Sequence, residues 1–172
     1  MSEEQRDAGA ALTVWFFDSA MGATAGQMRL RAVSPRVAVV LDTVTMSWMP
    51  GTHAPRVGRA RRRGAAPRSS PLAAFATSLL RSGPDAAASG PDALPPGLGA
   101  VDREFLREMK ARLVLGTSAL LVLSTGTDLD GVRRVIERGR AHGEITLMHA
   151  SLPNGTLVGS PDVGDPERPD RT

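Results

Sequence analysis

The sequence predicts a mixed α/β protein, and three observations carry this prediction. Residues 12–17 and 117–124 hold apolar side chains at both alternating positions, which is typical of strands covered on both sides. Residues 101–113 and 127–143 instead repeat apolar side chains with a helical period. Strand and helix patterns alternate along the chain, so the strands are expected to form one sheet with helices packed on it.

The first half of the predicted domain, residues 11–52, consists of a strand, a helix and a second strand. Strand 12–17 is followed by small residues and helix formers at 22–33, which predict a helix. Pro35 ends this helix, because proline lacks the backbone N–H that a helix interior needs. Alternating side chains then predict a long strand over 37–48.

Period-two alternation in strand 37–48 assigns its side chains to two faces. One face is expected to carry Val40, Asp42, Val44, Met46 and Trp48, and the other Thr43, Thr45 and Ser47. The first face is apolar apart from its single carboxylate, so Asp42 is expected beside the core.

Residues 53–99 differ in composition from both flanking halves. An arginine cluster is followed by repeated alanine, serine, glycine and proline, with one short helical pattern at 71–81. Such a segment buries too little apolar surface to offset the entropy of ordering it. We therefore expect a disordered linker here, and further disordered segments at 1–10 and 153–172.

The second half, residues 100–152, begins with the helix over 101–113. Its apolar side chains recur every fourth residue, at Val101, Phe105, Met109 and Leu113. Strand 117–124 follows, and its apolar side chains on both faces are typical of a strand inside a sheet.

The last helix is predicted over 127–143. Thr127 offers an N-cap with Asp130 three residues later, and Gly143 is a typical residue at a helix C-terminus. The expected apolar face consists of Leu129, Val132, Ile136 and Gly139. A short strand over 144–150 completes the domain.

The predicted order is strand, helix, strand, linker, helix, strand, helix, strand. Two split βαβ halves with right-handed crossovers most simply build an antiparallel four-stranded sheet with helices on one face. This is the ferredoxin-like arrangement, interrupted here by the linker.

Three segments of the chain resemble a known family. They are LTVWFFDS at 12–19, VLDTVTMSWMPG at 40–51 and DREFLREMKARLVLGTSALLVLS at 102–124. The pattern resembles the DUF1269 family, bacterial proteins of unknown function that are often labelled membrane proteins. Members carry a long glycine-rich apolar stretch between the two halves, whereas this chain has residues 59–99 in that place. The resemblance implies no catalytic residue.

The composition excludes several classes of function. The chain of 172 residues has no cysteine, which rules out disulfides, thiolate metal sites and thiol catalysis. It has no Walker loop or dinucleotide fingerprint, and His53, His142 and His149 lack the spacing of metal ligands. We expect no cofactor and no bound metal.

Two features bear on where the protein acts. Residues 1–10 are acidic and polar, unlike a secretory signal. The longest apolar stretch, 113–123, is shorter than the roughly 20 residues of a membrane-spanning helix. The chain is therefore expected in the cytoplasm, with peripheral attachment to the inner face of the membrane as an alternative.

The strongest candidate site in the sequence is an arginine cluster within 56–68. It consists of Arg56, Arg59, Arg61, Arg62, Arg63 and Arg68, in a chain of net charge +3. Closely spaced arginines neutralise the phosphates of nucleic acid or of an anionic lipid surface, with an affinity that falls with salt. The competing interpretation is a solvated linker, because no aromatic side chain lies within the cluster to stack on bases.

A second candidate is the carboxylate pair Asp18 and Asp42. Two carboxylates near one edge of a sheet suit metal binding or acid–base chemistry. The competing interpretation, which we favour, is structural: Asp42 is hydrogen-bonded near the sheet edge and Asp18 caps the turn into the first helix. Ser118 lies in a strand pattern and lacks the glycines of a nucleophile elbow.

These observations predict a non-enzymatic interaction or regulatory module. Its sheet is expected to self-associate into a homo-oligomer through an uncovered face or an exposed edge strand. The alternative is an anion-tethered protein that binds nucleic acid or the inner membrane surface through the arginine cluster. An enzyme with an acidic site at Asp18 and Asp42 is the least supported reading, and no small-molecule substrate is predicted.

Overall fold

A computed structural model of the chain describes residues 10–59, 70–81, 98–138 and 145–153. Its strands are β1 (Ala11–Phe17), β2 (Val39–Ser47), β3 (Arg56–Arg59), β4 (Ser118–Thr125) and β5 (Ile145–Ser151). Its helices are α1 (Gly22–Leu30), α2 (Pro71–Arg81), α3 (Arg103–Arg112) and α4 (Leu129–Glu137), with a 3₁₀ turn η4 (Leu98–Ala100).

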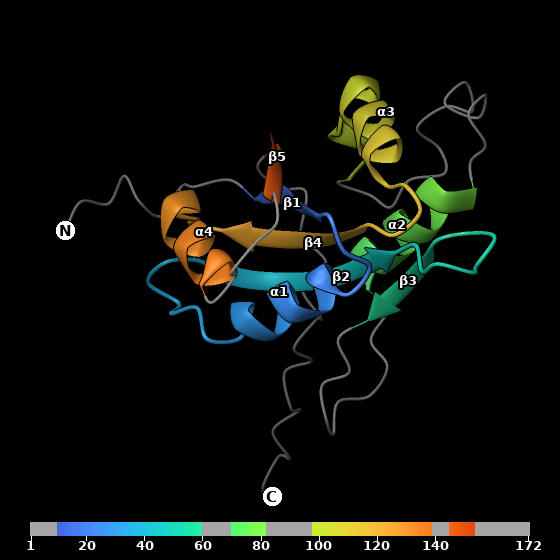
Figure 1. Ribbon diagram of the computed structural model, residues 1–172. Coiled ribbons are helices and arrows are strands. Elements are labelled where there is room, and N and C mark those ends of the chain that lie inside the picture. Colours follow the sequence, from blue (N-terminus) through green and yellow to red (C-terminus); the bar gives the residue numbers. More distant parts are fainter. Residues whose placement is uncertain (1–9, 60–69, 82–97, 139–144, 154–172) are drawn as a thin grey trace, which may run out of the picture.

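The five strands form one antiparallel sheet in the order β3-β2-β4-β1-β5 (Figure 1). β4 inserts between β1 and β2 and so separates them in the sheet, whereas β2 and β3 are neighbours both in the chain and in the sheet. β1 and β4 lie inside the sheet, whereas β3 and β5 are its edges. The mixed α/β class is confirmed, and the ferredoxin-like assignment stays a prediction.

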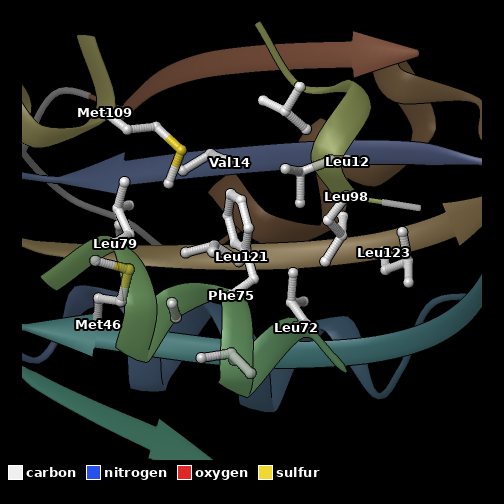
Figure 2. Close-up of a cluster of buried hydrophobic side chains, with 14 of the residues drawn as sticks. Leu12, Val14, Met46, Leu72, Phe75, Leu79, Leu98, Met109, Leu121 and Leu123 are labelled. Carbon is white, nitrogen blue, oxygen red and sulfur yellow. The ribbon is translucent and has the colours of Figure 1, made fainter. Parts of the chain in front are cut away.

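Helices cover both faces of the sheet, so the expectation of helices on one face is wrong. On one face, α2, η4 and α3 pack on the strands through Leu12, Val14, Met46, Leu72, Phe75, Leu98, Met109 and Leu121 (Figure 2). On the other face, α1 and α4 pack through Trp15, Phe17, Ala23, Leu30, Leu120, Val122, Val132 and Ile136. The physical reason is that β1 and β4 carry apolar side chains on both faces, and each face must be removed from water.

Part of the predicted linker is ordered. β3 and α2 lie within 53–99, and β3 is the fifth strand that the four-stranded prediction lacked. The helical pattern at 71–81 is borne out by α2, whose Leu72, Phe75 and Leu79 are buried. The segments 60–69 and 82–97, like the predicted tails at 1–9 and 154–172, lie outside the described residues.

β2 departs from the predicted alternation. A register shift against β4 falls between Val40 and Asp42, and it leaves Leu41 exposed. Val40 consequently packs on the α1/α4 face, whereas Val44 and Met46 pack on the α2/α3 face. The prediction that Val40 shares a face with these residues is wrong, because an extra residue in a strand reverses the alternation on one side of it.

α1 lies close to the sheet because its inner face is made of small residues. A Cβ atom at Gly26 would stand 2.7 Å from Cζ of Phe17, and one at Gly22 would overlap the Phe17 side chain more severely. Both glycines therefore serve close packing, although glycine lowers helix propensity. The helix ends at Leu30, three residues before the predicted end.

α3 and α4 begin at aspartate caps. Asp102 Oδ1 accepts a hydrogen bond from the backbone N–H of Phe105 at 2.7 Å, and Asp128 Oδ1 accepts from Gly131 at 3.0 Å. The prediction of Thr127 as the N-cap of α4 is wrong, because its hydroxyl instead lies 2.7 Å from that of Ser124. The prediction that this helix continues to Gly143 is wrong, because α4 ends at Glu137 and the backbone of Arg138 has a non-helical ψ of 127°. Gly143 itself lies outside the described residues.

Candidate functional site

Ser118 in the GTSAL segment holds together two distant parts of the chain. Its buried hydroxyl donates to the backbone oxygen of Ser19 at 2.6 Å and accepts from the backbone N–H of Ala23 at 2.9 Å. The first turn of α1 has no side-chain cap at Met21, so this hydroxyl satisfies one of its unpaired N–H groups. Ser118 thus has a structural role, as the strand pattern predicts.

Asp42 anchors α2 to β2. Its Oδ2 accepts from the Ser70 hydroxyl at 2.7 Å and from the Leu72 N–H at 3.3 Å, and Oδ1 accepts from the Thr43 N–H at 2.8 Å. Ser70 in turn caps the helix by accepting from the Ala73 N–H at 2.9 Å. A carboxylate at a helix N-terminus also interacts favourably with the helix dipole. The carboxylate of Asp42 therefore has a structural role, because both of its oxygens accept hydrogen bonds from the protein.

The two carboxylates of the predicted acidic site are not brought together. Asp42 is paired with Leu123 across β2 and β4, and Leu123 with Leu12 across β4 and β1. Asp18 follows the far end of β1, about 20 Å away along the strand direction at ~3.3 Å per residue. The hypothesis of a site that combines Asp18 with Asp42 is therefore wrong, because the antiparallel register keeps the two carboxylates apart.

The arginine cluster is only partly described. Arg56 and Arg59 are the first and last residues of β3, where their backbones pair with Ser47 and Val44. The Arg56 side chain is exposed. Arg61, Arg62, Arg63 and Arg68 lie outside the described residues. The anion-binding site therefore stays a prediction.

Other titratable groups do not converge. His53 and His149 are both exposed, and His142 lies outside the described residues. Among the residues that the structure describes, no three His, Asp or Glu side chains form a group able to hold a metal ion. On α4, the exposed Arg133 donates to Glu137 at 2.8 Å, which raises the pKa of Arg133.

The two sheet edges differ, and this difference defines the candidate site. β5 is seven residues long and contains no Asp, Glu, Lys or Arg. Its Ile145, Leu147 and Ala150 are half-buried apolar side chains that pack against the two cores. β3 is four residues long and carries an arginine at each end. Short, charged edges resist strand pairing, whereas long uncharged ones invite it.

The outer edge of β5 presents an alternating set of backbone groups. The N–H of Leu152 donates to the oxygen of Ala10 at 2.7 Å, which sets the phase of the β1–β5 ladder. In an antiparallel ladder, alternate residues direct their N–H and C=O groups to opposite sides. The groups directed away from β1 belong to Ile145, Leu147, His149 and Ser151. In the described part of the sheet, no strand pairs with this edge.

The sequence contained only part of the signal for this site. A strand over 144–150 was predicted, but that range includes Glu144; the uncharged strand is the observed Ile145–Ser151, and its position at an edge follows from the strand order. Buried polar atoms were also missed: Thr13 Oγ1 and Trp15 Nε1 have no hydrogen-bond partner among the described residues.

Comparison with protein-family models and with curated proteins gave no match to this sequence, and comparison with solved structures gave no match to the fold. The resemblance to DUF1269 accordingly stays a prediction. Within the described segments, no helix has both the length and the apolar character required to cross a membrane.

Proposed function

We propose that the protein is a non-enzymatic interaction module that self-associates through the outer edge of β5. The observation that carries this proposal is the contrast between β5, a long uncharged edge, and β3, a short edge with arginines at both ends. Because helices cover both faces of the sheet, association through a sheet face is disfavoured. The outer edge of β5 is then the part of the sheet best suited to pair with a strand of another molecule.

Two copies would pair their β5 strands antiparallel about a twofold axis. This arrangement is isologous, because the same strand serves both partners. It would satisfy the outward backbone groups of Leu147 and His149, and it would cover the half-buried apolar side chains at the edge. The sheet would then continue from one copy into the other.

The test is the molar mass of the full chain, measured by light scattering during size-exclusion chromatography over a range of concentrations. His149→Pro removes an outward N–H and leaves the hydrogen bonds to β1 in place, because His149 directs its backbone away from β1. We expect the wild type to be a dimer or larger, and His149→Pro to be a monomer.

His149→Ala is the matched control, since it removes the exposed side chain but keeps the N–H. It should retain the wild-type mass. His149→Lys is a second variant, which places like charges near the twofold axis and should weaken association. A monomeric wild type, or a His149→Pro variant that is folded by circular dichroism and still associates, would refute the proposal.

A second function, attachment to an anionic partner through the arginine cluster, is favoured by the exposure of Arg56 at the start of β3. Arg56 has no carboxylate partner in the described ion pairs. Replacing Arg61, Arg62 and Arg63 with serine should abolish salt-sensitive binding to nucleic acid or anionic vesicles and leave the molar mass unchanged. Unchanged binding by this variant would argue against tethering.

A further inference from the structure

Two tight turns of the same design lie side by side at one end of the sheet. They are 49–52, with the sequence MPGT, and 114–117, with the sequence VLGT, and together they are called the paired turns. In each, the N–H of the threonine donates to the backbone oxygen of the first residue, at 3.1 Å for Thr52 and 3.0 Å for Thr117. The glycines have φ of 82° at Gly51 and 86° at Gly116, which makes both type II turns.

The paired turns are held rigidly. Each threonine hydroxyl donates to the same backbone oxygen as its N–H, at 2.8 Å in both turns. Trp48 joins the two turns, because its N–H donates to Thr117 at 3.0 Å and its oxygen accepts from Gly116 at 2.8 Å. The indole Nε1 of Trp48 also donates to the oxygen of Thr52 at 3.2 Å. The two tips therefore keep fixed positions relative to each other.

The tips of these turns are apolar and exposed. Leu115 is 57% exposed, Val114 is 50% exposed and Met49 is 36% exposed, while Trp48, which is hydrogen-bonded to both turns, is half-buried. Met21 is 58% exposed and lies at the same end of the sheet, on the β1–α1 connection. Apolar side chains gathered on preformed turns, away from either core, indicate an interaction surface.

The two chain segments that carry the paired turns contain cationic side chains and no carboxylate. Segments 47–56 and 112–117 contain Arg56, Arg112 and His53 and no carboxylate. Arg112 is ion-paired with Glu108 at 2.7 Å, and Asp18 lies on the neighbouring connection. Arg56 has no carboxylate partner in the described ion pairs. Apolar tips with a tryptophan beside them and arginines around them match the boundary between lipid headgroups and acyl chains.

We propose that the paired turns dock on an anionic lipid surface, with Met49, Val114 and Leu115 inserted into the interface and Arg56 at the headgroups. This proposal is independent of self-association, because β5 lies at the opposite lateral edge of the sheet from β3 and takes no part in the turns.

The experiment is co-sedimentation of the full chain with vesicles of phosphatidylcholine alone and of phosphatidylcholine mixed with phosphatidylglycerol. We expect binding to the anionic vesicles that weakens as salt is added, together with a blue shift in tryptophan emission. The shift reports on Trp48, because Trp15 is fully buried. Arg56→Gln should weaken binding to anionic vesicles only.

Leu115→Glu should lower the vesicle partition coefficient about tenfold, because it replaces an inserted apolar side chain with a charge. Leu41→Glu is the matched control: Leu41 is 47% exposed but belongs to the shifted part of β2, toward the other end of the sheet. It should bind like the wild type. Both variants are checked for folding by circular dichroism.

Three results would overturn the proposal. The first is the absence of wild-type binding to anionic vesicles, and the second is equal binding by Leu115→Glu and the wild type. In the third, Leu115→Glu lowers the molar mass of the protein, which would show that a second copy covers the turns. A His149→Pro variant that still binds vesicles would separate this surface from the β5 edge.

Discussion

The two helix layers of the protein reach their packing by different means. α1 lies close to the sheet through glycine and alanine, and the space beneath it is filled largely by Trp15 and Phe17 of β1. α2 and α3 lie on the opposite face and supply large side chains of their own, including Phe75 and Met109. Beneath α1 the strand thus supplies the large side chains, whereas α2 and α3 add large side chains of their own to those of the strands. Substitutions in the two layers should therefore destabilise the protein for opposite reasons, a cavity beneath α2 and overpacking beneath α1.

The largest expected effect is a cavity beneath α2. Phe75 is fully buried against the sheet, so Phe75→Ala should lower the free energy of unfolding by about 3–5 kcal/mol. Urea denaturation followed by circular dichroism measures this loss. The control is Ala74→Ser at the exposed neighbouring position, which should cost less than about 1 kcal/mol. Equal stability of the two variants would show that α2 is not part of the core.

The second prediction concerns overpacking beneath α1. Gly22→Ala places a methyl group against the Phe17 side chain, so it should destabilise the protein by about 1–3 kcal/mol even though alanine favours helices. The matched control is Gly99→Ala in η4, where an added Cβ meets no atom within 4 Å. Thermal unfolding should show a lower midpoint for Gly22→Ala only. A stabilised Gly22→Ala would mean that α1 moves away from the sheet without cost.

The smallest expected effect tests whether α2 and α4, which lie on opposite faces, are each anchored by an aspartate of their own. Asp42→Ala removes the hydrogen bonds to Ser70 and Leu72 and should cost about 1–2 kcal/mol. Amide hydrogen exchange should show lost protection in α2, with α4 protected as in the wild type. Asp128→Ala should give the reverse, because Asp128 caps α4. Equal loss in both helices after Asp42→Ala would contradict a local anchoring role.

The candidate sites show where sequence-based reasoning succeeds. The helical spacing of Val101, Phe105, Met109 and Leu113 predicted a buried face, and all four side chains are buried. The structural reading of Asp42 was also supported, since its carboxylate is hydrogen-bonded to α2. Its partner, Ser70, lies in a segment expected to be disordered. A capping interaction between distant segments leaves no local pattern in the sequence.

The sequence by itself determined the types of the principal elements, because periodicity and turn residues act over a few neighbouring positions. It showed that β1 and β4 are apolar on both faces. Tertiary structure alone decided the strand order, the shifted register of β2 and the closeness of the paired turns. These features depend on contacts between segments far apart in the chain, whose energies are set by mutual packing and pairing. They are also the features that placed β5 at an edge of the described sheet and separated Asp18 from Asp42.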